Sequence, residues 1–269
     1  MEQKIVLITG GSSGIGKSIG NFLVSKGYKV YGTTRNLAKY PDFNDFDLLE
    51  LDVRKIASIN EAVSELLAKE GRLDVLINNA GVGITGPIEE TPHEEILKAF
   101  DTNFHGPLHM IKAVLPPMRK QGNGLIINIT SIAGYMGLPY RGIYSATKSA
   151  LEITTEALRM EIKDFGIHMT NLAPGDFATN IANGRYHAPV LEDSAYKEAY
   201  GKTLTLINEG VSTGDDPIQV AHMVYGIIKT KHPKGHYKVG SFMQKFSIVL
   251  KRILPDKAYE KLLLNHYKL

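Results

Sequence analysis

Tyr144 and Lys148 are the two side chains in this sequence whose spacing best suits proton transfer. They stand four residues apart at the start of a predicted helix, so both lie on one helix face. An ammonium beside a phenol favours the phenolate form. The spacing therefore predicts that Tyr144 acts as a general acid or base near neutral pH. Because Tyr-x-x-x-Lys is also a frequent coincidence, the rest of the chain has to support this interpretation.

A glycine-rich turn near the N-terminus predicts a phosphate site. The strand expected at 5–9 runs into Thr-Gly-Gly-Ser-Ser-Gly-Ile-Gly at 9–16, and a helix is expected to follow. Glycines permit the tight turn and let the backbone approach a pyrophosphate. The helix N-terminus supplies free N–H groups and a positive dipole, and the serines can add hydroxyl donors. A plain structural turn is the alternative, but the place of the turn between the first strand and the first helix favours phosphate binding.

The elements that must position these residues alternate along the chain. Short apolar runs predict strands at 5–9, 29–33, 47–51, 75–78, 125–129, 168–172 and 237–239. Helix-period segments between them predict helices near 15–26, 56–69, 94–119, 144–165 and 217–230. Continuous apolar strands separated by helices are typical of parallel strands that are buried on both faces. The expected fold class is α/β, a single doubly wound Rossmann-type domain with a mostly parallel sheet of about seven strands and helices on both faces.

Two segments depart from this alternation. Residues 176–214 are polar, with one helix expected near 191–209, and such an excursion after a strand is expected to form a substrate lid. Residues 241–269 form a basic amphipathic tail, which we expect to be helical and packed on the same domain. Residues 1–240 would then form the catalytic domain.

The composition excludes several classes of protein. The chain has 269 residues, of which 43% are hydrophobic and 22% charged, as in ordinary globular proteins. It has no cysteine, which excludes disulfides and thiolate chemistry, and its net charge of +3 gives no reason to expect nucleic acid. It shows neither a signal peptide nor an apolar run of membrane-spanning length, so we expect a cytoplasmic protein. No histidine pattern predicts a metal, and His105 and His109 are interpreted as solvated or helix-packing residues.

In combination, the motifs resemble the short-chain dehydrogenase/reductase family in its compact form. They follow the family's order and spacing from residue 5 to about 240. The motifs are Thr-Gly-x-x-x-Gly-x-Gly at 9–16, Asn78-Asn79-Ala80-Gly81, Asn103, Ser131, Tyr144-x-x-x-Lys148 and Pro174-Gly175. The chain length and the basic tail resemble those of the hydroxysteroid and retinol dehydrogenase branches of the family. These branches are not sharply separated from the broad-specificity ketoreductases.

The resemblance implies a catalytic set of Asn103, Ser131, Tyr144 and Lys148. Ser131 would polarise a substrate carbonyl, and Tyr144 would donate the proton during reduction. Lys148 would assist Tyr144 and hold the nicotinamide ribose hydroxyls. The backbone of Asn103 would position a water that links the lysine to solvent. The alternatives are structural, with Ser131 capping a turn and Asn103 capping a helix.

The residues after the second predicted strand favour NADP(H) over NAD(H). Thr34 occupies the position where NAD-preferring relatives carry Asp, and Arg35 follows it. A guanidinium pairs well with a ribose phosphate, although Arg35 is alternatively a solvated surface residue. Asp52 would accept from the adenine amino group; the structural alternative, which is compatible with this role, is that it caps a helix. The expected cofactor-binding residues are Gly10, Ser12, Ser13, Gly14, Ile15, Gly16, Thr34, Arg35, Asp52, Val53, Asn79, Ala80, Gly81, Tyr144, Lys148, Pro174, Gly175 and Thr179.

The substrate end and the tail leave alternatives open. The residues after Ser131 are mostly apolar and are expected either to wall a hydrophobic pocket or to pack under a lid; they are Ile132, Tyr135, Met136, Leu138 and Tyr140. In the tail, five Lys and one Arg stand against one Asp and one Glu, a net charge of +4. A basic amphipathic helix can lie on a membrane surface. Packing of its apolar face on the pocket rim or on a partner subunit is the favoured interpretation.

We therefore expect an NADP(H)-dependent oxidoreductase that interconverts a ketone or aldehyde and an alcohol by hydride transfer. The expected partner is a small hydrophobic carbonyl or alcohol, such as a steroid, retinoid, lipid or broad ketone. The predicted helices 94–119 and 144–165 match those through which the family forms homodimers and homotetramers. A non-catalytic, NADP-sensing protein and an epimerase or dehydratase are the alternatives. The intact catalytic set argues against the first, and the glycine spacing argues against the second.

Overall fold

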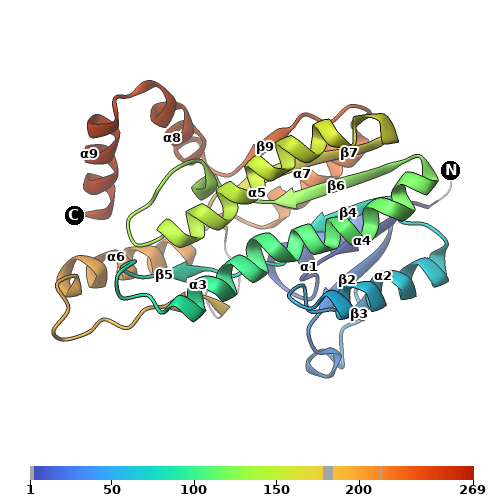
Figure 1. Ribbon diagram of the computed structural model, residues 1–269, viewed down its shortest axis with the longest axis horizontal. Helices are drawn as coiled ribbons and strands as arrows, with labels where there is room; N and C mark the ends of the chain where they lie inside the picture. The colour runs from blue at the N-terminus through green and yellow to red at the C-terminus, as the bar shows by residue number, and fades with distance from the viewer. Residues whose placement is uncertain (1–2, 178–183, 213) are drawn as a thin grey trace.

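Seven strands form one parallel sheet in the computed structural model, which describes residues 3–177, 184–212 and 214–269 (Figure 1). Their order across the sheet is β3-β2-β1-β4-β6-β7-β9. The strands are β1 (Ile5–Ile8), β2 (Lys29–Thr34), β3 (Asp47–Glu50), β4 (Val75–Asn78), β6 (Gly124–Ile129), β7 (Ile167–Pro174) and β9 (His236–Val239). The predicted α/β class and its seven strands are confirmed. The order reverses between β1 and β4, where ligands of doubly wound sheets bind at the carboxyl ends.

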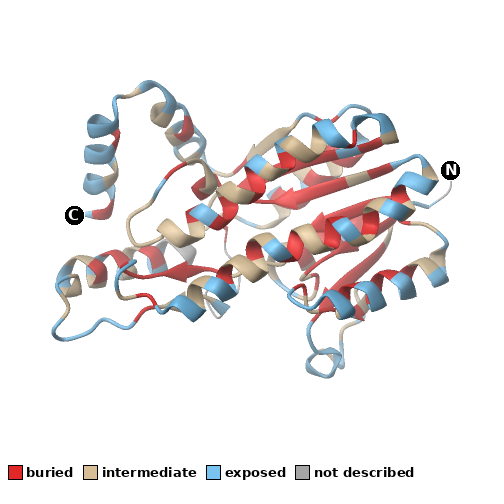
Figure 2. Ribbon diagram, viewed as in Figure 1, coloured by how far each residue is buried: buried red, intermediate tan, exposed pale blue. Residues whose placement is uncertain are grey.

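Helices cover both faces of the sheet, which explains the continuous apolar strands. In β1, Leu7 packs into one hydrophobic cluster while Val6 and Ile8 pack into the other. The first cluster lies under α2 (Ile56–Glu70) and α4 (Gly106–Gln121), with α5 (Gly142–Glu161) against β7; the second lies under α1 (Gly14–Ser25) and α7 (Ile218–Lys229). Figure 2 shows the strands as buried and the outer helix faces as exposed.

The predicted helix 94–119 is three segments rather than one. It consists of α3 (His93–Phe100), a π-helical turn at Asp101–His105, and α4. A π-helical turn inserts an extra residue into the hydrogen-bond ladder, and such turns are frequent at functional sites. Hydrophobic periodicity does not detect the insertion because the apolar face continues on both sides of it.

The predicted helix 144–165 begins two residues earlier, as α5, and ends at Glu161. A 3₁₀ turn at Lys163–Phe165 follows, and Gly166 closes it with φ +70°. Two further 3₁₀ turns lie at Leu37–Lys39 and Ile132–Tyr135. The helix expected near 191–209 is α6 (Lys197–Ser212). A small parallel pair, β5 (Ile84–Thr85) with β8 (Tyr186–His187), was not predicted, because two-residue strands carry no periodic signal.

The tail forms two helices, α8 (Phe242–Ile253) and α9 (Asp256–Tyr267), separated at Pro255. Both lie on the side of the molecule toward which the strands point (Figure 1). Buried Ile248 and Tyr259 pack against Ile132 and Met136 of the segment after β6. No helix among the described residues is both long and apolar enough to cross a bilayer.

Candidate active site

The glycine turn leaves no space for side chains between β1 and α1. Gly10 and Gly14 have φ of +64° and +53°, which favour glycine. A Cβ on Gly11 would stand 2.6 Å from the Gly32 Cα, and one on Gly16 would overlap the Gly10 carbonyl oxygen. Ser13 is the N-cap of α1, and its side chain makes no capping hydrogen bond. The turn therefore presents the free N–H groups of α1 to the cavity beside it.

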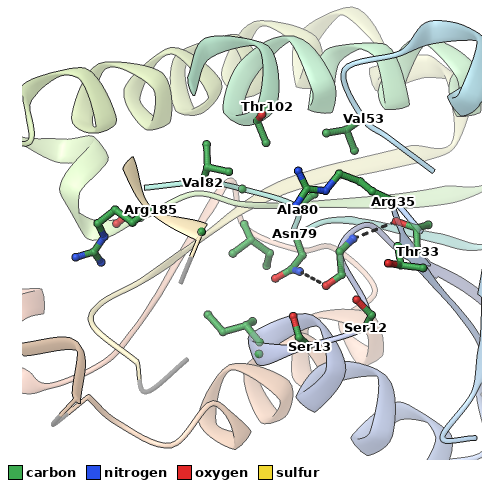
Figure 3. Close-up of a pocket in the computed structure, with 18 of the residues that line it drawn as sticks. Ser12, Ser13, Thr33, Arg35, Val53, Asn79, Ala80, Val82, Thr102 and Arg185 are labelled. Atoms are coloured by element: carbon green, nitrogen blue, oxygen red, sulfur yellow. Dashed lines mark hydrogen bonds between the residues drawn. The ribbon is translucent and has the colours of Figure 1, made fainter. Parts of the chain in front are cut away.

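Asn79 fixes the shape of this turn from the end of β4. Its Nδ2 donates to the backbone oxygens of Thr9 at 2.9 Å and Gly10 at 3.2 Å. The Gly10 N–H in turn donates to Thr33 Oγ1 at 3.1 Å (Figure 3). The sequence resemblance placed Asn79 among the cofactor-binding residues; here its side-chain amide donates to the backbone of the glycine turn.

A basic edge lies at the end of β2. Arg35 follows Thr34, the last residue of that strand, and its exposed side chain has no hydrogen-bond or ion-pair partner among the described residues. Asp52 at the end of β3 pairs with Arg54 at 2.7 Å, and the hydrogen bond from Arg54 holds the pKa of the Asp52 carboxyl below its usual value. The N-cap of α2 is Lys55, so the alternative in which Asp52 caps this helix is wrong.

The polar residues predicted for catalysis converge where β6 and α5 meet. Ser131 follows β6, and its Oγ accepts a hydrogen bond from the Ala133 N–H at 3.1 Å. Tyr144 and Lys148 both lie on α5. Lys148 is buried, and its Nζ donates to the Ile129 carbonyl at 3.0 Å. Burial lowers the pKa of Lys148, while Tyr144 and then Glu152 act in the opposite direction.

Asn103 lies in the π-helical turn and is fully buried. Its Oδ1 accepts from the Val82 N–H at 2.8 Å, and its Nδ2 donates to the Val82 carbonyl at 2.9 Å and to Thr147 Oγ1 at 3.1 Å. A Cβ on Gly81 would meet Asn103 Oδ1 at 3.2 Å and Lys148 Nζ at 3.4 Å. The side chain of Asn103 thus joins the segment between β4 and β5 to α5, beside Lys148.

These residues share one cavity of about 720 Å³, within the roughly 300–1,000 Å³ that is usual for ligand sites. Of the predicted residues, those lining it are Gly10, Ser12, Ser13, Gly14, Ile15, Thr34, Arg35, Asp52, Val53, Asn79, Ala80, Gly81, Ser131, Tyr144, Lys148, Pro174 and Gly175. Gly16 and Asn103 stand behind the lining in the turn and the π-helical turn. Thr179 lies outside the described residues.

Two arginines that sequence reasoning missed line the end of the cavity near Tyr144. The Arg141 guanidinium lies 5.3 Å from the Tyr144 ring centroid and also contacts Tyr267 of α9. Arg185 lies toward the opposite end of the cavity from Arg35 (Figure 3). Burial, followed by the nearby Arg141, lowers the pKa of Arg185, and its buried Nη1 has no hydrogen-bond partner among the described residues. Arg141 stands three residues before Tyr144, a helical spacing that could have indicated its place beside the tyrosine. No sequence pattern indicated Arg185.

A buried carboxylate below Lys148 was also missed. Glu152 accepts hydrogen bonds from Thr130, from Tyr135 OH at 3.1 Å and from Asn171 Nδ2 at 2.9 Å. His236 of β9 contacts it through Nδ1 at 2.8 Å, and Nε2 of the same ring lies 3.2 Å from Glu156 on the surface. Because Tyr144, Lys148 and Glu152 follow each other at four-residue steps on α5, the sequence carried a signal for this stack.

The residues expected to wall an apolar pocket do not line this cavity. Ile132 and Met136 are buried under the tail, with Tyr135 and Leu138 packed against the same cluster. Tyr140 packs against Tyr196 and Tyr200 near the start of α6. The packing alternative therefore holds for this segment, because α8 and α9 cover it.

The shape and charge of the cavity fit a phosphorylated dinucleotide. The glycine turn lines the cavity at the N-terminus of α1, whose free backbone N–H groups can donate to pyrophosphate oxygens. Arg35 lines the same cavity and makes no hydrogen bond or ion pair among the described residues. Ser131, Tyr144 and Lys148 line it as well.

Comparisons with known proteins identify the family of this chain. A family model described as short chain dehydrogenase matches residues 4–189. The 3-ketodihydrosphingosine reductase of Bacteroides thetaiotaomicron is 39% identical over 257 residues, 95% of each chain. The crystal structure of a short-chain dehydrogenase from Streptomyces avermitilis is 32% identical, with TM-score 0.81 over 98% of this chain and 97% of the other. The structure of ElxO with NADP bound is 28% identical, with TM-score 0.73 over 88% of this chain and 97% of the other.

Proposed function

This chain belongs to the short-chain dehydrogenase/reductase family, and on that premise we propose that it reduces a hydrophobic ketone or aldehyde with NADPH, in a reaction that also runs from the alcohol. One observation carries the proposal. A single cavity is lined by the glycine turn and Arg35 toward one end and by Ser131, Tyr144 and Lys148 toward the other. A phosphate-binding end joined to an acid–base end is what hydride transfer from a dinucleotide requires.

Each polar residue has a distinct task in this proposal. The nicotinamide cofactor supplies or accepts the hydride when it is bound. Ser131 donates a hydrogen bond to the substrate carbonyl oxygen, and Tyr144 transfers its phenolic proton to the same oxygen as it becomes an alcohol. Buried Lys148, held by the Ile129 carbonyl, stabilises the phenolate that remains. Asn103, through Val82 and Thr147, holds the two walls of the site in register.

The preference for NADP(H) over NAD(H) rests on the edge after β2. A carboxylate at the position of Thr34 would repel a ribose phosphate, whereas Arg35 makes no hydrogen bond or ion pair among the described residues and can pair with it. Asp52 is already neutralised by Arg54, so its charge adds little repulsion nearby.

For the substrate we propose a long-chain or polycyclic carbonyl compound, and 3-ketodihydrosphingosine is the first to test because of the relative at 39% identity. The segment 176–214 would cover the substrate as a lid on the 1–240 domain, and the 241–269 tail would close one side. The contact between Tyr267 of α9 and Arg141, beside Tyr144, supports a role for the tail in shaping the substrate end.

Replacing Tyr144 by Phe tests the proposed chemistry. The variant should fold and bind NADPH, because only a hydroxyl is removed, yet NADPH oxidation with 3-ketodihydrosphingosine or a steroid ketone should fall at least about 100-fold, the lower range for loss of a general acid. NADPH fluorescence measures binding, and absorbance at the reduced nicotinamide band measures turnover.

Tyr140→Phe is the matched control, since Tyr140 packs away from the cavity. Turnover by Tyr144→Phe at the wild-type rate would refute the acid role. A wild-type protein that binds NADPH but reduces no member of a panel of lipid, steroid, retinoid and small ketones would favour the alternative of a dinucleotide sensor.

Replacing Arg35 by Ala tests the cofactor preference. A lost charge-assisted bond to phosphate is worth about 1.5–3 kcal/mol, so the KM for NADPH should rise roughly ten- to a hundredfold while the KM for NADH stays near its wild-type value. Steady-state kinetics with both cofactors measures the ratio. If Arg35→Ala prefers NADPH over NADH by the same factor as the wild type, a residue other than Arg35 binds the ribose phosphate.

A further inference from the structure

The orientation of α8 on the protein body is the reverse of what its composition predicts. The side chains that face the body include polar Gln244 and Ser247, beside buried Ile248. Gln244 Nε2 donates to Asp176 at 3.0 Å, and Ser247 lies on Met136. Amphipathic helices of a globular protein normally turn their apolar stripe inward. Here Gln244 and Ser247 are packed against the body together with Ile248 and Leu250.

The apolar stripe of α8 faces solvent instead. Phe242, Met243 and Ile253 are 73%, 66% and 67% exposed, and Phe246 and Val249 are exposed as well. The rings of Phe242 and Phe246 stack on each other with centroids 5.6 Å apart, outside the hydrophobic clusters of the body. With Phe242, Phe246, Val249 and Ile253 spaced at four, three and four residues, these side chains form one continuous stripe along the helix.

The charges beside this stripe are all of one sign. Lys245 and Arg252 are exposed on its flank, and α8 contains no Asp or Glu. The next helix, α9, adds exposed Leu262 and Leu264, while its exposed Lys257 and Lys261 are balanced by exposed Asp256 and Glu260. An apolar stripe flanked by cations is the arrangement that inserts at the headgroup level of an anionic bilayer.

We propose that α8 docks this protein on an anionic membrane surface, with Phe242, Met243, Phe246, Val249 and Ile253 inserted among the lipids and Lys245 and Arg252 at the headgroups.

A second copy of the chain fits the exposed stripe of α8 less well than a membrane does. A 12-residue helix is about 18 Å long, and a stripe about 10 Å wide then offers roughly 200 Å², against about 800 Å² per partner in a stable interface.

The place of α8 gives the docking a consequence for the reaction. The Gln244 carboxamide lies against Gly175 and bonds Asp176, and both of these residues line the active-site cavity. A docked α8 would hold that cavity close to the lipid surface, where a lipid carbonyl compound is concentrated. The docking itself does not depend on the proposed activity, so the two are tested separately.

Cosedimentation of the full chain with vesicles tests the docking. Wild type should pellet with vesicles of phosphatidylglycerol and phosphatidylcholine in equal parts, and stay in the supernatant with pure phosphatidylcholine. Phe242→Ser/Phe246→Ser should lower the partition coefficient at least about tenfold, since two exposed rings lose their apolar burial. Ile56→Ser, an exposed apolar residue on α2, is the matched control and should pellet as wild type does.

Charge reversal and a fluorescent reporter complete the experiment. Lys245→Glu/Arg252→Glu should abolish pelleting, while Lys4→Glu/Lys231→Glu, with the same change in net charge elsewhere, should retain most of it. The chain has no tryptophan, so Phe246→Trp supplies a single reporter whose emission should shift to the blue on adding anionic vesicles.

Three results would overturn the proposal: wild type left in the supernatant with anionic vesicles, equal pelleting of Phe242→Ser/Phe246→Ser and wild type, or an unshifted Trp emission. The stripe would instead be covered by another copy of the chain if the wild type were oligomeric and failed to pellet while Phe242→Ser/Phe246→Ser was monomeric. Turnover of a short, soluble ketone by the α8 variants tests the active site separately from docking. If neither the wild type nor any variant turned this ketone over, the result would contradict only the proposed function.

Discussion

At the residue scale, Tyr144, Lys148 and Glu152 form a stack of ionisable side chains at four-residue steps along α5. Burial disfavours the ammonium of Lys148, whose pKa is lowered accordingly, and Glu152 offsets part of that cost. Glu152 is itself buried, with hydrogen bonds from Thr130 and Asn171. We infer that its role is to position and charge Lys148, since it does not line the cavity.

Glu152→Gln should therefore change the pH dependence of reduction. Removing the carboxylate removes a contribution that raises the pKa of Lys148, so this pKa falls further. The protonated lysine is then lost at lower pH, and the alkaline limb of kcat/KM for reduction should move to lower pH. Rate profiles against pH measure the shift, while NADPH binding at acid pH should remain near wild type.

Glu156→Gln is the control for this substitution. Glu156 is more than half exposed and contacts the same His236 ring, but it lies outside the buried cluster. Its profile should superimpose on that of the wild type. If the pH–rate profile of Glu152→Gln also superimposed on that of the wild type, Glu152 would have no role in acid–base catalysis and would be a structural residue.

At the element scale, the turn between β1 and α1 depends on the absence of side chains. Gly16→Ala places a Cβ against the Gly10 carbonyl oxygen and the Asn79 amide, so the turn has to shift. We expect a loss of about 1–3 kcal/mol in the free energy of unfolding and weaker NADPH binding. Urea unfolding and fluorescence titration measure the two effects.

Gly226→Ala supplies the comparison from α7. No atom lies within 4 Å of the added Cβ, and the φ of Gly226 is not positive. Alanine in a helix interior should stabilise the protein by up to about 1 kcal/mol and leave NADPH binding unchanged. If Gly16→Ala behaved in the same way, close packing at the turn would not be what requires glycine.

The sequence predicted the elements that local patterns define. Apolar runs such as Ile5–Ile8 identified the strands, and a fixed order of motifs brought Ser131, Tyr144 and Lys148 to one cavity. Arg141 and Glu152 stand at helical spacings on α5 and could have been found from the sequence, whereas other missed features depend on contacts between distant segments. Glu152 meets His236 across 84 residues, which no helical spacing reveals. The orientation of α8 was missed because amphipathicity shows that a helix has two faces, not which face the body covers.

At the scale of the whole molecule, α5 presents a second surface opposite its catalytic face. Ile153 and Met160 are 64% and 68% exposed, and seven residues apart they lie on one side of the helix. Exposed apolar residues grouped on a helix mark an interaction site. We propose that two copies of the chain pair through α5, as the family resemblance led us to expect.

Ile153→Glu/Met160→Glu should then convert the oligomer to a monomer. Two opposed pairs of carboxylates would be forced into a desolvated contact, which costs several kcal/mol. Size-exclusion chromatography with light scattering measures the mass. Ile56→Glu on α2 should leave the mass unchanged, and a wild type that is already monomeric would exclude this interface.

The bonds from Asn79 to Thr9 and Gly10 span 70 and 69 residues, and β1 pairs with β4 over the same interval. A ribosome therefore releases the glycine turn long before the asparagine that fixes it, and Lys148 emerges later still. The nascent chain carries an apolar first strand with one open edge for much of its synthesis, which exposes it to aggregation. Under the proposed function, a nicotinamide cofactor can act as a folding ligand only after α5 has emerged, so cofactor supply would protect the finished chain and do nothing for the growing one.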